Sequence, residues 1–262
     1  MCRRQNVELL QAEVDEDDQS FFRLLIDGQS IKYVTIESGL YTAEDMCFGP
    51  ALVALLPEFP PGDWNDGLVA GDPKGDQPYF KHVARTQFPG VRYKWHETDV
   101  DYLDIAVGKK LRTGIYEITC PKFDTVVVAK FARFHWEIQY LENETIAYEW
   151  IDGCEIGPRF LGHLIEDNRV IGFLMERITN ARHAGPNDLP ACQQTLSQLH
   201  RLGVRHGDTN RFNFLIRGSK AVLIDFDSAR KCDDQDTLRK ELEDLEGCLN
   251  DLSQKGGGGL LC

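Results

Sequence analysis

Runs of apolar and β-branched residues in the first third of the chain predict β-structure. Residues 21–27 and 31–36 are two such runs, and the three residues from Gly28 to Ser30 separate them, a spacing typical of a β-hairpin. Proline and glycine at residues 59–64 and 88–90 then indicate turns and loops. No internal repeat is visible, so this part is expected to be β-rich but not a repeat array.

Four aromatic residues stand in the turn-rich region: Trp64, Tyr79, Tyr93 and Trp95. Because large aromatic side chains mainly supply buried area, we expect them to cover the sheet predicted for the middle of the chain, from about residue 102 to residue 175. The alternative interpretation is that they line a substrate pocket.

The middle of the chain alternates between strand and helix patterns. Residues 126–130 form a β-branched run that ends at Lys130, and residues 170–178 have the pattern of a buried strand that leads into a hinge. Between them, residues 137–151 place apolar groups on one helical face, with Glu144 at its edge. These patterns predict a helix with a strand on either side of it in the sequence.

Helical periodicity returns in the last third of the chain. Residues 188–202 predict a helix that Asn187 or Asp188 caps, and Pro190 is tolerated in its first turn. The apolar positions of this helix are expected to face the core: Leu189, Cys192, Leu196, Leu199 and Leu202.

A second hairpin and a final helix complete the predicted elements. Gly218 and Ser219 connect residues 214–217 to residues 221–224, the pattern of a tight hairpin. The final helix opens at residues 234–238 and carries one apolar stripe: Leu238, Leu242, Leu245, Leu249 and Leu252. We expect the stripe to pack on the core, with a dimer seam as the alternative.

Composition and charge narrow the class of protein. A chain of 262 residues with net charge −13 predicts one two-lobed domain or two small domains, and disfavours binding to nucleic acid or anionic membranes in general. No run approaches about 18 apolar residues and no apolar secretory signal is visible, so we expect a cytoplasmic protein without a membrane partner. The eight cysteines lack a C-x-x-C pair and zinc spacing, and are expected to be reduced thiols.

The strongest chemical signal lies between the last two predicted helices. Residues 206–213 have the pattern H-x-D-x4-N, and an Asp-Phe pair follows at Asp225. The second hairpin folds the chain back, so Asp208, Asn213 and Asp225 are expected to meet at one cleft. Phosphoryl transfer from Mg-ATP requires such a set: a carboxylate near the attacking hydroxyl, and an amide and a carboxylate on the metal. Taken singly, these residues also suit turns and caps, and His206 also suits a core position that braces a loop.

Together with the V-V-V-A-K strand that ends at Lys130, this segment resembles the protein-kinase-like superfamily. Gly207 stands where protein kinases usually carry arginine, which is more similar to aminoglycoside and choline phosphotransferases. The run from about residue 101 to residue 259 also resembles a group of uncharacterised fungal kinase-like proteins that share an H-G-D-x-N-R-x-N-F-L segment.

The resemblance implies roles for five side chains. Lys130 is expected to contact the phosphates of ATP, and Glu144 is the first choice for its ion-pair partner. Asp208 is expected to be the catalytic base. Asn213 and Asp225 are expected to bind Mg²⁺.

The resemblance also implies how the rest of the nucleotide is bound. Glu137 is the second choice for the partner of Lys130. The hinge backbone around Glu176 and Ile178 is expected to bind the adenine edge. Gly108 and Gly114 bound the only candidate for a glycine-rich phosphate loop.

The chain departs from the protein-kinase pattern in two places within this set. The middle glycine of the phosphate loop is missing, and Lys109, Lys110 and Arg112 offer positive charge there instead; a plain strand–turn–strand is the alternative interpretation. Asn210 stands where protein kinases usually carry a lysine, and the neighbouring Arg211 is a possible substitute.

We therefore expect an α+β, protein-kinase-like two-lobed fold with a reduced C-lobe and a β-rich N-terminal extension. The resemblance implies a five-stranded antiparallel sheet in the N-lobe, from about residue 102 to residue 175. Residues 1–100 would form the extension of unassigned role, residues 101–178 the N-lobe and hinge, and residues 179–262 a short helical C-lobe with the catalytic loop. The few residues after Asp225 leave no peptide-binding platform, which disfavours a protein substrate.

The predicted function is an ATP- and Mg²⁺-dependent phosphotransferase that acts on a hydroxyl of a small molecule or metabolite. One alternative is a catalytically silent, pseudokinase-like binding module. Another is non-phosphoryl chemistry in natural-product biosynthesis, such as cyclic dipeptide formation with aminoacyl-tRNA as a partner. The intact set of Lys130, Glu144, Asp208, Asn213 and Asp225 favours phosphoryl transfer, while the acceptor and the oligomeric state stay open.

Overall fold

The computed structural model describes residues 5–72, 75, 77–251 and 253. It divides the chain into two compact units, Met1–Phe88 and Pro89–Cys262, each with a hydrophobic core of its own. The architecture is mixed α+β, with several sheets and five α-helices among the described residues. Among these helices, none has the length and apolar character that crossing a lipid bilayer requires.

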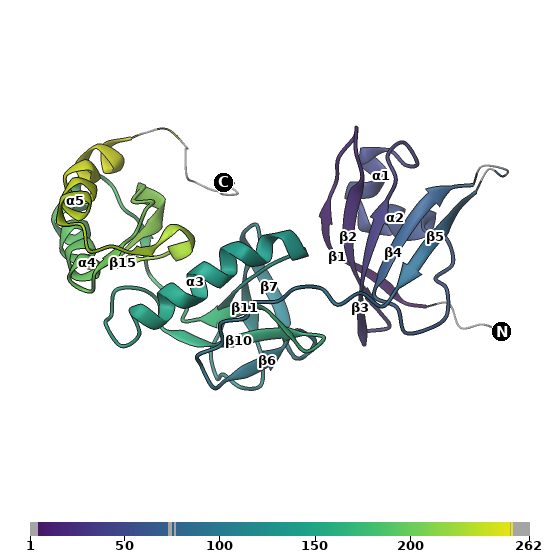
Figure 1. The fold of residues 1–262 in the computed structure, drawn as a ribbon, viewed down its shortest axis with the longest axis horizontal. Helices are drawn as coiled ribbons and strands as arrows, with labels where there is room; N and C mark the ends of the chain where they lie inside the picture. The colour runs from purple at the N-terminus through teal and green to yellow at the C-terminus, as the bar shows by residue number, and fades with distance from the viewer. Residues whose placement is uncertain (1–4, 73–74, 76, 252, 254–262) are drawn as a thin grey trace. The chain divides into compact units, whose positions relative to one another are not determined.

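The first unit is built on a five-stranded sheet in which β3 and β4 are parallel and the other neighbours are antiparallel (Figure 1). The predicted hairpin is confirmed, because β2 and β3 pair through a turn in which Gly28 has a φ of 69°. The strands in sheet order are β1 (Val7–Glu13), β2 (Ser20–Ile26), β3 (Ser30–Ile36), β4 (Asp66–Gly71) and β5 (Pro78–Ala84).

Two short helices cover the core face of this sheet. Met46 of α1 (Ala43–Cys47) and Leu52 of α2 (Gly49–Leu55) are buried in one cluster with alternate residues of β2 and β3. Trp64 is buried in the same cluster, so it covers the sheet of the first unit and not the later sheet as predicted, whereas Tyr79 is exposed on β5.

The second unit begins with a six-stranded sheet. Five of its strands are antiparallel neighbours, as predicted, and a sixth strand, β6, adds to the edge parallel to β10. The sequence could not indicate β6, because it has only three residues and a single apolar one. The strands in sheet order are β6 (Asp99–Asp101), β10 (Phe160–Glu166), β11 (Arg169–Met175), β9 (Val127–Phe131), β8 (Ile115–Thr119) and β7 (Ala106–Arg112).

The predicted helix over residues 137–151 is confirmed as α3 (Ile138–Trp150), which follows the short 3-10 turn His135–Glu137. Its apolar side packs against β11, and the rings of Tyr148 and Phe173 lie 5.0 Å apart. One polar residue of that buried side is Glu144, which is 1% exposed.

A strap of residues 89–98 fastens α3 to the sheet. The main chain of Val91 donates to the Val170 carbonyl in β11 (2.8 Å), and the indole of Trp95 donates to the Thr145 carbonyl in α3 (3.0 Å). These contacts explain why the second unit begins at Pro89, whereas the sequence placed the start of its N-lobe at residue 101.

The helical part of the second unit contains α4 (Leu189–Arg201) and α5 (Gln235–Asn250), which pack on each other. Pro190 stands in the first turn of α4 as predicted, but the Asp188 carboxylate does not cap that helix. It accepts from the Gly185 N–H (2.8 Å) instead, at the start of the preceding 3-10 turn Pro186–Asp188.

The apolar stripe of α5 packs on the core: Leu238, Leu245 and Leu249 are buried and Leu242 is partly buried, while Leu252 lies outside the described residues. The predicted second hairpin is confirmed as β14 and β15, with β12 beside β14. The remaining strands are β12 (Arg182–His183), β13 (Val204–Arg205), β14 (Phe214–Arg217), β15 (Lys220–Leu223) and β16 (Arg230–Lys231), of which β13 pairs with β16.

Candidate active site

A cavity of about 660 Å³ opens in the second unit between the six-stranded sheet and the helical part. Its wall includes Lys130 of β9, Met175 at the end of β11, and Ile224 and Asp225 after β15. A volume of this size is typical of small-molecule and cofactor sites. None of the four aromatic residues singled out in the sequence lines it, so the pocket interpretation of these residues is wrong for this cavity.

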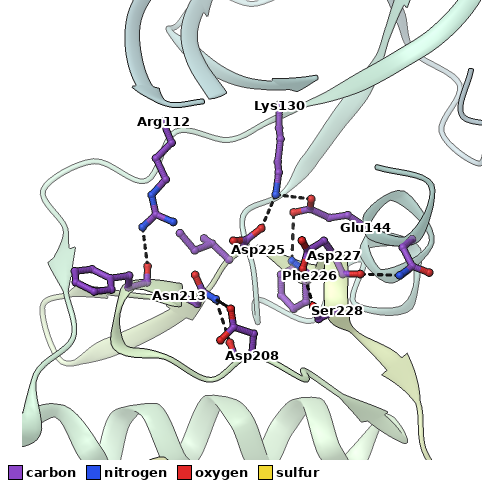
Figure 2. A network of polar contacts seen from close by, with 12 residues as sticks. Arg112, Lys130, Glu144, Asp208, Asn213, Asp225, Phe226, Asp227 and Ser228 are labelled. Atoms are coloured by element: carbon purple, nitrogen blue, oxygen red, sulfur yellow. Dashed lines mark hydrogen bonds and ion pairs between the residues drawn. The ribbon is translucent and has the colours of Figure 1, made fainter. Parts of the chain in front are cut away.

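Lys130 is the central cation of the cavity (Figure 2). Its Nζ lies 2.6 Å from Glu144 Oε2 and 2.5 Å from Asp225 Oδ1. The structure thus brings Lys130 to its first-choice partner. The second choice, Glu137, pairs with Arg133 instead (2.5 Å).

Burial and charge act against each other in this cluster. Burial raises the pKa of Glu144 to about 7 even beside Lys130, and the negative charge of Asp225 adds to that rise. Burial alone would lower the pKa of Lys130, but the two carboxylates outweigh it and raise the pKa. Burial would raise the pKa of Asp225, and Lys130 lowers it on balance. Lys130 therefore stays protonated and Asp225 ionised near neutral pH.

Asp225 has a left-handed backbone, with a φ of 66°, which is uncommon for a residue other than glycine. The next residue helps to hold this conformation, because the Phe226 N–H donates to Glu144 Oε1 (3.3 Å). One buried carboxylate therefore positions both Lys130 and the turn at Asp225. Strained backbone of this kind is a common feature of functional sites.

The loop that carries Asp208 is braced by His206, which is fully buried. The Asp208 N–H donates to His206 Nδ1 (3.3 Å), so the proton is placed on Nε2, which donates to the Ile224 carbonyl (3.1 Å). Burial lowers the pKa of His206 and keeps the ring neutral. His206 is a core histidine that ties the Asp208 loop to the strand leading into Asp225.

Two amides hold the Asp208 carboxylate. Asn213 Nδ2 donates to Asp208 Oδ2 (3.1 Å), and Asn210 Nδ2 lies 2.9 Å from each carboxylate oxygen. The Asn213 side chain is buried, and its Oδ1 makes no hydrogen bond with the described residues. Figure 2 shows Asn213 between Asp208 and Asp225.

The buried Asn213 Oδ1 is a test of whether the site suits Mg²⁺. A buried carbonyl oxygen without a partner favours a cation, and the Asp225 carboxylate supplies negative charge beside it. Among the described residues, no group of three or more His, Cys, Asp or Glu side chains has the arrangement of a metal site. Two protein ligands fit Mg²⁺, which commonly takes one or two protein groups and fills its other positions with water and phosphate.

Glu241 of α5 is a site residue that the sequence reasoning missed. Its carboxylate accepts from the His206 N–H (3.1 Å) and the Gly207 N–H (2.6 Å), and it pairs with His200 (2.7 Å). Burial would raise its pKa, but these donors lower it on balance. A signal was available, because Glu241 interrupts the leucine stripe at a core-facing position.

The remaining predicted residues fall into two groups. Glu176 and Ile178 line the cavity, as expected for a hinge. Gly108 and Gly114 do not line it: Gly108 lies inside β7, and Gly114 forms the tight turn to β8 with a φ of 70°. The strand–turn–strand alternative describes the geometry of this segment, and neither glycine lines the cavity.

A second cavity of about 420 Å³ adjoins the first site on the side of α5. It is lined by Asp208, Thr209 and Arg211 of the loop and by Asp244 and Cys248 of α5, among others. Its wall thus carries both acidic and basic side chains, and it includes Asp208, the predicted catalytic base.

A lysine–glutamate pair and an aspartate around one cavity, together with an Asp–Asn loop, resemble the type of site seen in kinase-like phosphotransferases. Residues 179–255 match the model of the lipopolysaccharide kinase (Kdo/WaaP) family. This part of the chain is therefore a kinase-like domain, which suggests phosphotransferase activity and the use of ATP. A search of curated proteins finds no match to the chain.

Proposed function

We propose that this protein transfers the terminal phosphate of Mg-ATP to a hydroxyl of a small molecule. The observation that carries the proposal is the ion pair of Lys130 and Asp225 in one cavity, with Asn213 bonded to Asp208, which lines a second cavity. The kinase-family match over residues 179–255 supports the same chemistry independently.

In this proposal, Asp208 accepts the proton of the acceptor hydroxyl while that oxygen forms a bond to the γ-phosphorus. The bond from the γ-phosphorus to the β–γ bridging oxygen breaks, and ADP leaves with the electron pair. Lys130 stabilises the negative charge of the phosphates, and Glu144 holds its ammonium in place.

Asn213 and Asp225 would hold Mg²⁺, which supplies neutralisation of phosphate charge when bound. The Asp225 carboxylate is suited to this because it stays ionised. The unpartnered Asn213 oxygen is suited because its amide nitrogen already binds Asp208, which fixes the direction of the oxygen.

The acceptor would enter through the second cavity, because that cavity reaches Asp208 from the side of α5. Its mixed wall of Arg211, Asp208 and Asp244 offers donors and acceptors of hydrogen bonds, which suits a polyhydroxylated molecule. A family named for kinases of lipopolysaccharide is consistent with a sugar acceptor.

The test is D208N, assayed for phosphate transfer from Mg-ATP to a panel of sugars and for Mg-ATP binding by calorimetry. We expect transfer to fall by about 10²–10⁴-fold, because the amide cannot take the proton, with binding within a few-fold of the wild type. D236N is the matched control, since Asp236 lies on the exposed start of α5, 81% exposed.

Two results would overturn the proposal. Transfer retained by D208N would remove Asp208 from the role of base. Wild-type protein that binds Mg-ATP but transfers phosphate to neither sugars nor water would instead favour a silent binding module.

A further inference from the structure

The turn between β7 and β8 is short. Only Thr113 and Gly114 separate the two strands, and Gly108, the other expected loop glycine, lies inside β7 at an irregularity of the pairing between Val107 and Lys110. An added Cβ at Gly108 would lie 3.1 Å from the Glu117 carbonyl oxygen, so this glycine serves a close approach of two strands. The backbone N–H groups of a phosphate loop are therefore missing from this side of the cavity.

Side chains of β7 occupy the place of that loop. Lys109, Lys110 and Arg112 all line the cavity together with Lys130. Their three positive charges face a site that lacks a backbone phosphate cradle. Phosphate charge can be met by such cations as well as by main-chain donors.

Arg112 extends from this group to the Asp208 loop. Its Nη2 lies 3.4 Å from the carbonyl oxygen of Phe212, the residue before Asn213 (Figure 2). Within the described residues, this long contact is the one hydrogen bond of its guanidinium. A guanidinium has five N–H donors, so several remain to bind an anion.

The charges around Arg112 locate it at the reacting end of the site. Burial lowers the pKa of Arg112, while the carboxylates of Asp225 and Asp208 act in the opposite direction. The Arg112 guanidinium is therefore close enough to both proposed site carboxylates to interact with their charges. The half-buried guanidinium thus holds a positive charge near both carboxylates, where phosphate oxygens would collect.

We propose that Arg112 binds the terminal phosphate of the nucleotide, as a side-chain clamp in place of a glycine-rich loop. This inference rests on the proposed function for the nucleotide. Its physical basis is that the planar guanidinium binds two phosphate oxygens at once, which a lysine cannot do.

The experiment is calorimetric binding of AMP, ADP and a non-hydrolysable ATP analogue, each with Mg²⁺, to the full chain. In R112Q we expect affinity for the ATP analogue to fall about 10–100-fold and affinity for AMP to stay within about 2-fold. R112K keeps the positive charge but loses the planar guanidinium that can bind two phosphate oxygens at once. Its loss of affinity for the ATP analogue should be intermediate. R239Q is the matched control, because Arg239 is 65% exposed on α5.

The outcomes separate this inference from the proposed function. If the wild type binds the analogue and R112Q and R112K bind it equally well, Arg112 is not a phosphate ligand, and the proposed function stands. An equal loss of affinity for AMP, ADP and the analogue would mean that Arg112 maintains the shape of the cavity and does not bind the terminal phosphate. That result would overturn the inference. Wild-type protein that binds none of the three nucleotides would overturn both. If R112Q fails to unfold cooperatively, R112K alone decides the result.

Discussion

Both units of this protein bury charged side chains, but they use them differently. In the first unit, fully buried Arg23 of β2 donates to Gln11 Oε1 (2.7 Å) on the neighbouring strand, and buried Lys32 of β3 donates to the Trp64 carbonyl. Arg23 and Gln11 are direct partners in the strand register. These charges are satisfied within the first unit, by a neighbouring strand and by the loop before β4.

In the second unit, buried charges come from separate elements and meet at a cavity. Lys130 belongs to β9, Glu144 to α3 and Asp225 to the turn after β15. Burial of charge costs free energy in both units, since a buried charge must be paired or hydrogen-bonded. The difference teaches that a buried charge indicates a site when its partners come from distant elements and one side stays open to a cavity.

The largest effect is expected when K130M is compared with K32M. K130M should lower phosphate transfer by about 10²-fold or more, because the phosphates lose their buried cation. K32M should leave transfer within about 2-fold and destabilise the first unit by about 1–3 kcal/mol, because the Trp64 carbonyl loses its donor. Transfer rates and chemical unfolding of both variants give the measurement. A loss of transfer in K32M equal to that in K130M would contradict the distinction.

Glu241 offers the next test, because it is a buried charge of the second unit that lines no part of the larger cavity. E241A leaves the N–H groups of His206 and Gly207 without an acceptor, so we expect a loss of about 2–4 kcal/mol in the free energy of unfolding.

The control for E241A is E243A on the same helix, where the side chain is 69% exposed and the expected change is within about 0.5 kcal/mol. Urea denaturation of both variants measures the difference. Equal stability of the two would show that the Asp208 loop does not depend on α5.

The smallest expected effect concerns the proton of Glu144. Burial raises its pKa to about 7 from the ordinary value of 4.5, so between these pH values the folded chain holds a proton that the unfolded chain releases. The contribution of Glu144 to stability therefore decreases as pH rises from about 5 to 7. The glutamine of E144Q cannot titrate. The free energy of unfolding of E144Q should therefore fall less steeply with pH over this range, and the two slopes should differ by up to about one proton. Parallel pH profiles of the two proteins would contradict the raised pKa.

Much of the second unit was predictable because its local patterns agree with its packing. The β-branched run before Lys130, the helix with Glu144 on its buried side, and the hairpin before Asp225 all appear as expected. The structure brings Lys130, Glu144 and Asp225 into direct contact, and Asn213 into contact with Asp208. Their roles in catalysis stay predictions.

Other features depend on contacts that no local pattern expresses. β6 is held by its parallel partner β10, and three residues give no periodicity. The spacing of Gly108 and Gly114 in the sequence suggested a loop. In the structure, β7 and β8 pair as far as Arg112 and Ile115, so only two residues form the turn. The position of Glu241 on the leucine stripe of α5 indicates burial, but only the folded loop supplies its N–H donors.

The strap of residues 89–98 has a practical consequence for dissecting the chain. It precedes the first strand of the second unit, so a fragment trimmed at residue 101 would lack the hydrogen bonds that Val91 and Trp95 make to β11 and α3. The helix that bears Glu144 would then lose its hydrogen bond to the strap. An expression boundary that respects the folded unit begins at Pro89.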